Sequence, residues 1–129
     1  MVAGSITDNG NIGIGTDAPI NKLEIHGSGN EFLRIVAGGT GYSAAGLKLE
    51  TTSSLNRPSG VYMYNSVAKN TWYMGRQYNV DVWGVGRTEE TDTLDTSAAD
   101  KSNAFLSVTG QGRVGIGLTS PSDELALAS

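Results

Sequence analysis

The phrase GNIGIGTD at residues 10–17 returns as GRVGIGLT at residues 112–119, and this repeat constrains the fold more than any other feature of the sequence. Shifting the sequence against itself by 102 positions aligns the two copies without a gap. The residues that the copies share include Ser5, Thr7, Gly10, Gly13, Ile14, Gly15, Pro19 and Leu23, which align with Ser107, Thr109, Gly112, Gly115, Ile116, Gly117, Pro121 and Leu125. Self-similarity of this kind indicates that one structural unit, here called the joint, occurs twice.

Each joint has the pattern of short strands separated by turns. It begins with an alternating stretch, at Ser5–Thr7 or Leu106–Thr109, which a turn rich in Gly, Asn or Gln follows. In Ile12–Gly15 isoleucine alternates with glycine, so a strand there shows isoleucine on one face and no side chain on the other. Such a bare face weakens a strand and is useful where another backbone approaches closely. A proline turn and a second alternating strand at residues 22–25 complete the unit.

The order of the glycines argues against nucleotide binding. A dinucleotide-binding motif has the spacing G-x-G-x-x-G and opens a helix. The joint has G-x-x-G-x-G instead, and a proline and strand-forming residues follow it. A phosphate-binding loop needs Gly-Lys-Ser/Thr, which the chain lacks. Close packing of backbones is therefore the preferred interpretation of these glycines.

Composition narrows the class of protein further. Glycine accounts for 18 of 129 residues, and polar residues separate short apolar runs, which favours many short strands over helices. The net charge of −4 without a basic stripe argues against nucleic acid as a partner. The absence of cysteine excludes disulfides and thiolate metal sites. No apolar run approaches the length of a membrane span. We therefore expect no nucleic acid, no membrane and no cofactor.

The region between the joints contains further strand patterns separated by turns. Candidate strands occur at residues 32–36, 46–51, 61–64, 71–75 and 80–85, and those at 46–51 and 61–64 alternate cleanly. Strands at this spacing predict an all-β fold with an antiparallel β-sandwich or jelly-roll-like domain. The expected organisation is a first joint at 1–27, a head domain at 28–105 and a second joint at 106–129. Residues 88–103 are polar and acidic, which predicts a long surface loop with a helical turn at residues 97–99.

Few residues are candidates for catalysis or metal binding. His26 is the only histidine, and we expect it at the surface or between subunits. The acidic loop could supply paired carboxylates of the glycosidase type, or calcium ligands at Asp92, Asp95 and Asp100. The spacing does not match an EF-hand, however, and carboxylates in a polar loop are usually solvated. The prediction is a protein that is not an enzyme, with no catalytic residue and no metal site; the carboxylates considered are Glu89, Glu90, Asp92, Asp95 and Asp100.

Aromatic residues gather in the head domain and suggest a ligand surface. Alternation places Tyr62 and Tyr64 on one face of a strand, and Val61 and Met63 on the other. We expect the aliphatic pair to face the core, which leaves the tyrosines outward. Exposed rings beside polar side chains could stack on the apolar C–H groups of a sugar. The predicted ligand-binding residues are Tyr62, Tyr64, Trp72, Tyr73, Arg76 and Tyr78. The alternative is that these rings pack in the core or between subunits.

The two joints also carry a family resemblance. GNIGIGTDAPINKLEI and GRVGIGLTSPSDELAL resemble the phrase G-N-V-G-I-G-T-x-x-P-x-x-K-L-x-V of bacteriophage tail-fibre and related virion fibre proteins. In that family the phrase often precedes a self-cleaving intramolecular chaperone domain. NTWYMGR at residues 70–76 is similar to the W-Y-x-G-R line found between such phrases. The second copy departs from the pattern at Leu118, where the family has Thr, and at Glu124, where it has Lys.

The resemblance implies an intertwined homotrimer in the tail fibre of a virion, outside the cell. Its strands would converge near a threefold axis at the glycines Gly13, Gly15, Gly115 and Gly117. The resemblance also implies contact with neighbouring segments of the parent fibre, and host attachment through a cell-surface glycan or another receptor. Three alternatives remain open: a purely structural fibre spacer, a glycan-depolymerising enzyme on a fibre scaffold, and a bacterial surface protein that uses the same joint.

Overall fold

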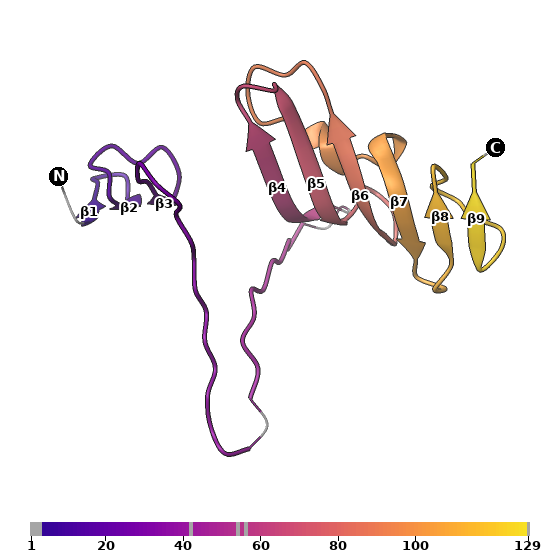
Figure 1. The fold of residues 1–129 in the computed structure, drawn as a ribbon, viewed down its shortest axis with the longest axis horizontal. Coiled ribbons are helices and arrows are strands. Elements are labelled where there is room, and N and C mark those ends of the chain that lie inside the picture. Colours follow the sequence, from indigo (N-terminus) through magenta and orange to yellow (C-terminus); the bar gives the residue numbers. More distant parts are fainter. Residues whose placement is uncertain (1–3, 42, 54, 56, 129) are drawn as a thin grey trace. The chain divides into compact units, whose positions relative to one another are not determined.

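The computed structural model describes residues 4–41, 43–53, 55 and 57–128 (Figure 1). The chain divides into two compact units, residues 1–47 and 48–129. The described residues form nine strands in two sheets, together with two short 3-10 helices. Neither of these helices has the length and apolarity that a membrane span requires. The expectation of an all-β fold is confirmed.

The first unit contains a three-stranded sheet built entirely from the first joint. Its strands are β1 (Gly4–Ile6), β2 (Ile12–Ile14) and β3 (Leu23–Ile25). Strand β1 runs antiparallel to β2, and β2 runs parallel to β3. The glycine turn predicted after β1 is present, because Gly10 adopts a φ of 74° and its N–H donates to the carbonyl of Thr7 at 2.8 Å.

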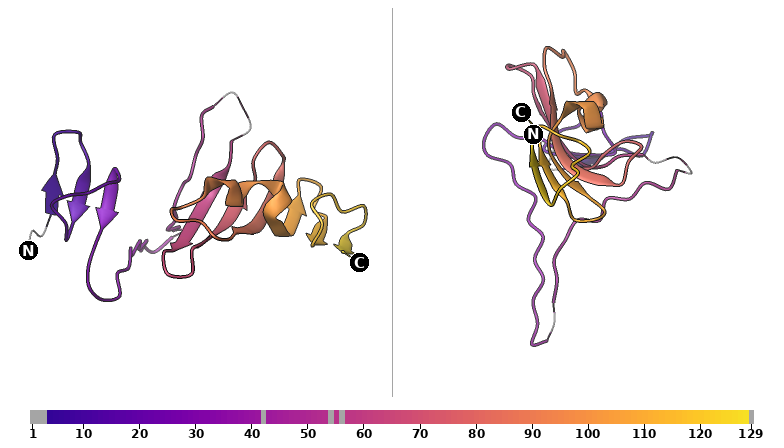
Figure 2. Two further views of the ribbon diagram at one scale, coloured as in Figure 1. Left: turned by 90° about the horizontal axis from the view of Figure 1, so that it is seen from above. Right: turned by 90° about the vertical axis from the view of Figure 1, so that its right-hand side faces the viewer.

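The second unit contains a six-stranded sheet in which the strands follow one another in chain order. These strands are β4 (Ser59–Asn65), β5 (Asn70–Arg76), β6 (Val82–Thr88), β7 (Ala104–Thr109), β8 (Val114–Ile116) and β9 (Leu125–Leu127). All neighbours are antiparallel except β8 and β9, which are parallel. The 3-10 helices η1 (Thr96–Ala99) and η2 (Lys101–Asn103) gather over one face of this sheet (Figure 2).

This arrangement differs from the head domain expected at residues 28–105. The described residues of the second unit form one sheet, so no second sheet packs against it within that unit. The second joint is also not a separate module, because β7 pairs with β6 of the head region and carries the sheet on into β8 and β9. The joint therefore extends the sheet rather than flanking it.

The strands β7–β9 repeat β1–β3 pair for pair at the spacing found in the sequence. Ser5 lies opposite Gly13 on β2, and Ser107 lies opposite Gly115 on β8. The turn hydrogen bond also recurs, since the backbone N–H of Thr109 donates to the carbonyl of Arg113 at 2.9 Å, just as Thr7 donates to Asn11 at 3.0 Å. The sequence repeat is thus a structural repeat in both strand register and turn geometry.

The core of the second unit lies under η1, on the tyrosine side of the sheet. Tyr73 is fully buried against Ala98 and Ala99, and its ring lies 4.7 Å from the ring of Tyr62. The prediction that the aliphatic residues of β4 face the core is therefore wrong, and Met63 is 46% exposed on the opposite face. The two alanines are small enough to lie over an aromatic ring. The loop that carries them therefore covers the face of the sheet on which the tyrosines lie.

Two predicted strands do not form. Residues 32–36 and 46–51 are predicted as strands, yet the described residues between β3 and β4 contain no strand. Their apolar side chains are exposed, including Phe32, Ile35 and Leu49. A strand needs a hydrogen-bonded neighbour as well as an alternating pattern, and none is available to these residues within the described part of the chain.

The burial of Tyr73 gives the stability of the protein an alkaline limit. Burial, reinforced by the nearby Tyr62, raises the pKa of the Tyr73 hydroxyl to about 12. Unfolded tyrosine titrates near pH 10, so the unfolded chain releases this proton first. Stability is therefore full below about pH 10 and falls as the pH rises towards 12. Urea midpoints measured from about pH 9 to about pH 11.5 should fall more steeply in the wild type than in Tyr73→Phe.

The comparison isolates one side chain, because all other residues are the same in the two proteins. Tyr73→Phe starts from a lower midpoint at neutral pH, since it also loses the hydrogen bond that the hydroxyl donates to the carbonyl of Arg76. Parallel pH curves for the two proteins would contradict the prediction.

Candidate functional site

The bare glycine face of each joint is filled by the chain's own loop. A Cβ atom added at Gly13 would lie 2.4 Å from the carbonyl oxygen of Thr16, and one added at Gly115 would lie 2.4 Å from that of Leu118. Both distances are far below van der Waals contact, so no side chain fits without moving backbone. The predicted close approach of backbones is confirmed, and the approaching backbone belongs to the loop after the strand.

A serine hydroxyl holds this loop in each copy. Ser5 Oγ donates to the carbonyl of Thr16 at 2.8 Å, and Ser107 Oγ donates to the carbonyl of Leu118 at 2.6 Å. Each serine lies directly opposite the joint glycine on the neighbouring strand. Sequence comparison shows that the serine is shared by the two copies, but only the register reveals its role. We call this arrangement of serine, glycine and loop carbonyl the serine latch.

Gly15 and Gly117 permit the turn that follows the strand in each joint. Gly15 has a φ of 76° and Gly117 a φ of 71°, a region that side chains other than glycine rarely adopt. A Cβ at Gly15 would also lie 2.0 Å from the carbonyl oxygen of His26. His26 itself is exposed, in agreement with its predicted surface position.

Removing one serine hydroxyl should weaken the second latch. Ser107 is fully buried, and Ser107→Ala leaves the Leu118 carbonyl without this donor. We expect a loss of about 1–2 kcal/mol in the free energy of unfolding, measured by urea titration. The control Ser53→Ala alters an exposed loop serine and should change stability by less than about 0.5 kcal/mol. Equal stabilities for the two variants would contradict a role for the latch.

The face of each joint opposite the latch is apolar and exposed. Register places the isoleucines and leucines of neighbouring strands side by side, so they form one patch. In the first joint this patch consists of Ile6, Ile12, Ile14, Leu23 and Ile25, and in the second of Leu106, Val108, Val114, Ile116, Leu125 and Leu127. All five residues of the first patch are at least 36% exposed.

In the second unit the apolar surface continues across the whole six-stranded sheet. Strand register brings alternate side chains of β4, β5 and β6, including those of Arg76 and Arg87, onto the face that carries the joint patch. A register shift between β6 and β7 adds Phe105, whose ring lies 5.7 Å from that of Trp72. The exposed members outside the joint are Met63, Trp72, Met74, Trp83 and Phe105. We refer to this whole surface of the second unit as the apolar face.

The predicted ligand-binding residues do not form one site. Tyr62 and Tyr73 pack in the core, and the hydroxyl of Tyr64 donates to the carbonyl of Thr91 at 3.2 Å. Trp72 belongs to the apolar face. Tyr73 is fully buried, which makes it inaccessible to a sugar. Arg76 Nη1 donates to the carbonyl of Arg57 at 3.3 Å, which links it to the surroundings of Tyr78.

Tyr78 is the predicted ligand residue that lines a hollow. The hollow has a volume of about 270 Å³, and its wall consists of Arg57, Pro58, Tyr78, Thr96, Ser97 and Asp100. The ring of Tyr78 is 38% exposed, and the Arg57 guanidinium carbon lies 5.3 Å from its centre. The hollow therefore combines an accessible ring with a cation, a carboxylate and hydroxyl groups.

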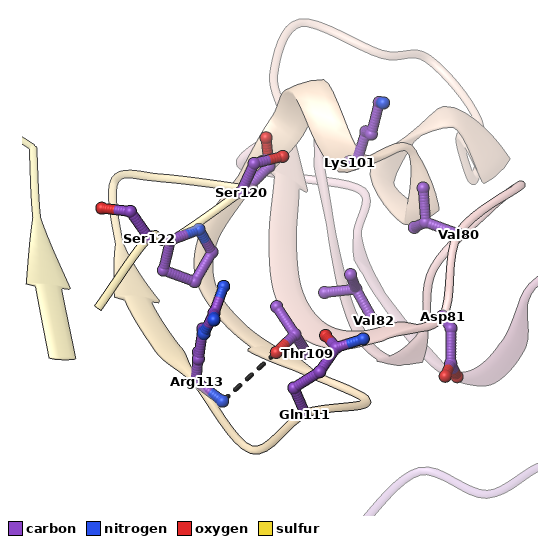
Figure 3. Close-up of a pocket in the computed structure, with 11 residues that line it drawn as sticks. Val80, Asp81, Val82, Lys101, Thr109, Gln111, Arg113, Ser120 and Ser122 are labelled. Atoms are coloured by element: carbon purple, nitrogen blue, oxygen red, sulfur yellow. Dashed lines mark hydrogen bonds between the residues drawn. The ribbon is translucent and has the colours of Figure 1, made fainter. Parts of the chain in front are cut away.

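A larger polar hollow lies beside the second joint (Figure 3). It has a volume of about 510 Å³ and is lined by Val80, Asp81, Val82, Lys101, Thr109, Gln111, Arg113, Thr119, Ser120, Pro121 and Ser122. Its wall includes two cations, Lys101 and Arg113, and one carboxylate, Asp81. No local pattern of the sequence indicates this hollow, because its residues come from four separate stretches of the chain that only the fold brings together.

The carboxylates of the acidic loop have structural partners. Asp95 and Asp100 cap η1 and η2 by accepting backbone N–H bonds from Ser97 and Ser102, each at 2.8 Å. These backbone bonds, assisted by the serine hydroxyls, lower the pKa of both carboxyl groups. Asp92 forms an exposed ion pair with Lys69 at 2.6 Å. Among the described residues, no three carboxylate or histidine side chains come together as a metal site would require.

The loop at residues 88–103 is accordingly more than a solvated connection. The helical turn predicted near its middle is confirmed as η1. Its two alanines are fully buried against the sheet, and the backbone N–H of Asp95 donates to Thr71 Oγ1 at 2.9 Å. The capping carboxylates fix the backbone of the loop, and the loop then closes the core.

Comparison with models of protein families gives no match for this chain, and comparison with curated proteins gives none either.

Proposed function

We propose that this chain is a segment of a homotrimeric virion tail fibre, in which three copies bury their apolar faces against one another around a common axis. The observation that carries the proposal is the apolar face itself. It extends across six strands, and its members include large side chains such as Trp72, Met74 and Trp83 that are all more than a third exposed. Two features of the sequence support three copies and the fibre, namely the duplicated joint and its resemblance to tail-fibre proteins.

The size of the face explains why a partner is required. Strands in a sheet lie about 4.8 Å apart, so six strands make a surface roughly 24 Å wide. A contiguous exposed apolar surface of this kind marks an interaction site in a soluble protein. Burial of apolar area is worth about 25 cal/mol per Å², so covering the face in a trimer supplies a large driving force for assembly.

In this assembly the joint glycines lie away from the axis. Gly13 and Gly115 are buried by their own loops, on the side of the sheet opposite the isoleucines. The isoleucine side is therefore the one that we assign to the subunit contact. Sheets that meet through their side chains pack about 10 Å apart, so the sheet-on-sheet packing expected for a sandwich would arise between chains.

The hollow beside Tyr78 is the part that we assign to host attachment. An exposed ring can stack on the C–H face of a sugar, while Arg57 and Asp100 offer hydrogen bonds to its hydroxyl groups. Three such hollows on one trimer would bind a dense glycan surface at the same time, so weak individual contacts would give a high overall avidity. In this proposal the hollows lie outside the cell, on the virion.

Sedimentation of the purified chain tests the assembly. We expect a mass three times the 13.4 kDa of one chain, stable at micromolar concentration. A monomer at that concentration would overturn the trimer and with it the fibre proposal.

A glycan array tests the attachment role separately. We expect binding by the wild-type trimer and a loss of about tenfold or more in Tyr78→Ala, which removes the stacking ring. Ser53→Ala is the control, because Ser53 is exposed and does not line the hollow. Binding that is unchanged in Tyr78→Ala would place attachment elsewhere, and no binding on the array would favour the structural spacer.

A further inference from the structure

The segment between β3 and β4 has the properties of a strand without a partner. Residues 46–51 read GLKLET, and their leucines alternate with the charged Lys48 and Glu50. Leu47 and Leu49 are exposed, and residues 46–51 belong to none of the strands that the described part of the chain forms. An alternating segment with exposed leucines gains both hydrogen bonds and apolar contacts when a sheet edge accepts it.

The six-stranded sheet offers such an edge at β4. Strand β4 is the first strand of the sheet, and among the described residues its seven-residue length is paired on one side, with β5. Proteins usually protect an exposed edge with charged residues, a proline or a bulge. Within its bounds β4 has the sequence SGVYMYN, which contains no charged residue and no proline, and its pairing with β5 shows no register shift.

From these two observations we infer that residues 46–51 of one copy add to the open edge of β4 in a second copy. The inference rests on the proposed trimer and identifies which segment intertwines its chains. Leu47 and Leu49 would then extend the apolar face beside Val61 and Met63, while Lys48 and Glu50 point to the other side, where they lie beside the tyrosines of β4.

Chain length permits this exchange between copies. Seven residues, 52–58, separate the segment from β4, and seven extended residues span up to about 25 Å. Sheets packed face to face are only about 10 Å apart, so the segment can reach a neighbouring copy. In the part of the chain that the structure describes, neither the outer edge of β4 nor residues 46–51 belong to a strand pair, and a second copy can supply the partner of each.

Engineered disulfides test the pairing, because the natural chain contains no cysteine. Residues directly opposite in a strand pair have Cβ atoms close enough for a disulfide. Each test variant of the full chain carries two cysteines, one from Leu47→Cys or Leu49→Cys and the other from Val61→Cys or Met63→Cys. After mild oxidation, we expect at least one pairing to give covalently linked chains on a non-reducing denaturing gel.

The control is Lys48→Cys combined with Met63→Cys, since neighbouring residues of a strand point to opposite faces and this pair should remain unlinked. Hydrogen exchange of the unmodified protein gives a second measurement. In the trimer, the amides of residues 46–51 should exchange at least about tenfold more slowly than those of residues 28–30.

The outcomes separate this inference from the proposed function. A trimer with slow exchange at 46–51 and links between chains supports both. A trimer in which the test pairs stay unlinked, or link only within one chain, overturns the strand exchange and leaves the fibre proposal standing. A protein that sediments as a monomer overturns both.

Discussion

Gly115→Val should destabilise the protein by about 3 kcal/mol or more, and should lower the midpoint of thermal unfolding by roughly 10–20 °C. The first atom of the new side chain would lie 2.4 Å from the Leu118 carbonyl oxygen and 2.8 Å from Ser107 Oγ. Neither neighbour can move freely, because the carbonyl belongs to backbone and the hydroxyl is hydrogen-bonded to that same carbonyl. The latch therefore has to open, and thermal unfolding followed by circular dichroism measures the cost.

Gly29→Val provides a matched control for the same chemical change. An added Cβ at Gly29 meets no other atom within 4 Å, and the residue does not have a positive φ. Its midpoint should stay within about 2 °C of the wild type. Gly13→Val should resemble Gly115→Val, since its Cβ meets the Thr16 carbonyl at the same 2.4 Å. If Gly115→Val were as stable as Gly29→Val, the close approach in the second joint would be refuted.

Met74→Glu should convert the trimer into monomers at micromolar concentration. Met74 lies on the apolar face, in the second strand of the sheet, and is 42% exposed in the single chain. In the trimer the substitution would bury one carboxylate per chain, and the removal of each from water costs several kcal/mol. In the monomer the same carboxylate can remain in contact with water, so the sheet should keep its far-ultraviolet circular dichroism. Sedimentation gives the mass.

Val67→Glu is the control for added charge. Val67 lies in the turn between β4 and β5, is 92% exposed and is not part of the apolar face. This variant should remain trimeric. Ile116→Glu tests the same face within the second joint and should dissociate the trimer as Met74→Glu does. Trimers formed by both Met74→Glu and Ile116→Glu would show that the apolar face is not the subunit contact.

The joint was the part of the fold that could be predicted best, because its signals are local. Alternating Ile and Gly, a turn glycine with positive φ and a following proline all act within about twenty residues, and β1–β3 and β7–β9 follow that pattern. Strands β4, β5 and β6 were also predicted, although each extends beyond the expected bounds. The pattern that predicts each of these strands lies within the strand itself.

The side of the sheet that forms the core could not be predicted in the same way. Alternation separates Tyr62 from Met63 but does not say which of them is covered. The cover comes from Ala98 and Ala99, more than thirty residues further along the chain, and the capping carboxylate of Asp95 fixes their turn. The aromatic cluster consequently divides between a core and an exposed face, and Tyr78 lines a hollow.

The sequence by itself determined the all-β class, the duplicated joint and the need for glycine at Gly13 and Gly115, because these depend on period, turn chemistry and the size of a side chain. Only the tertiary structure decided which atoms approach those glycines, which face of the sheet is covered and which strand patterns find a partner. Those features depend on contacts between residues far apart in the chain, and an alternating segment becomes a strand only where another backbone accepts its hydrogen bonds.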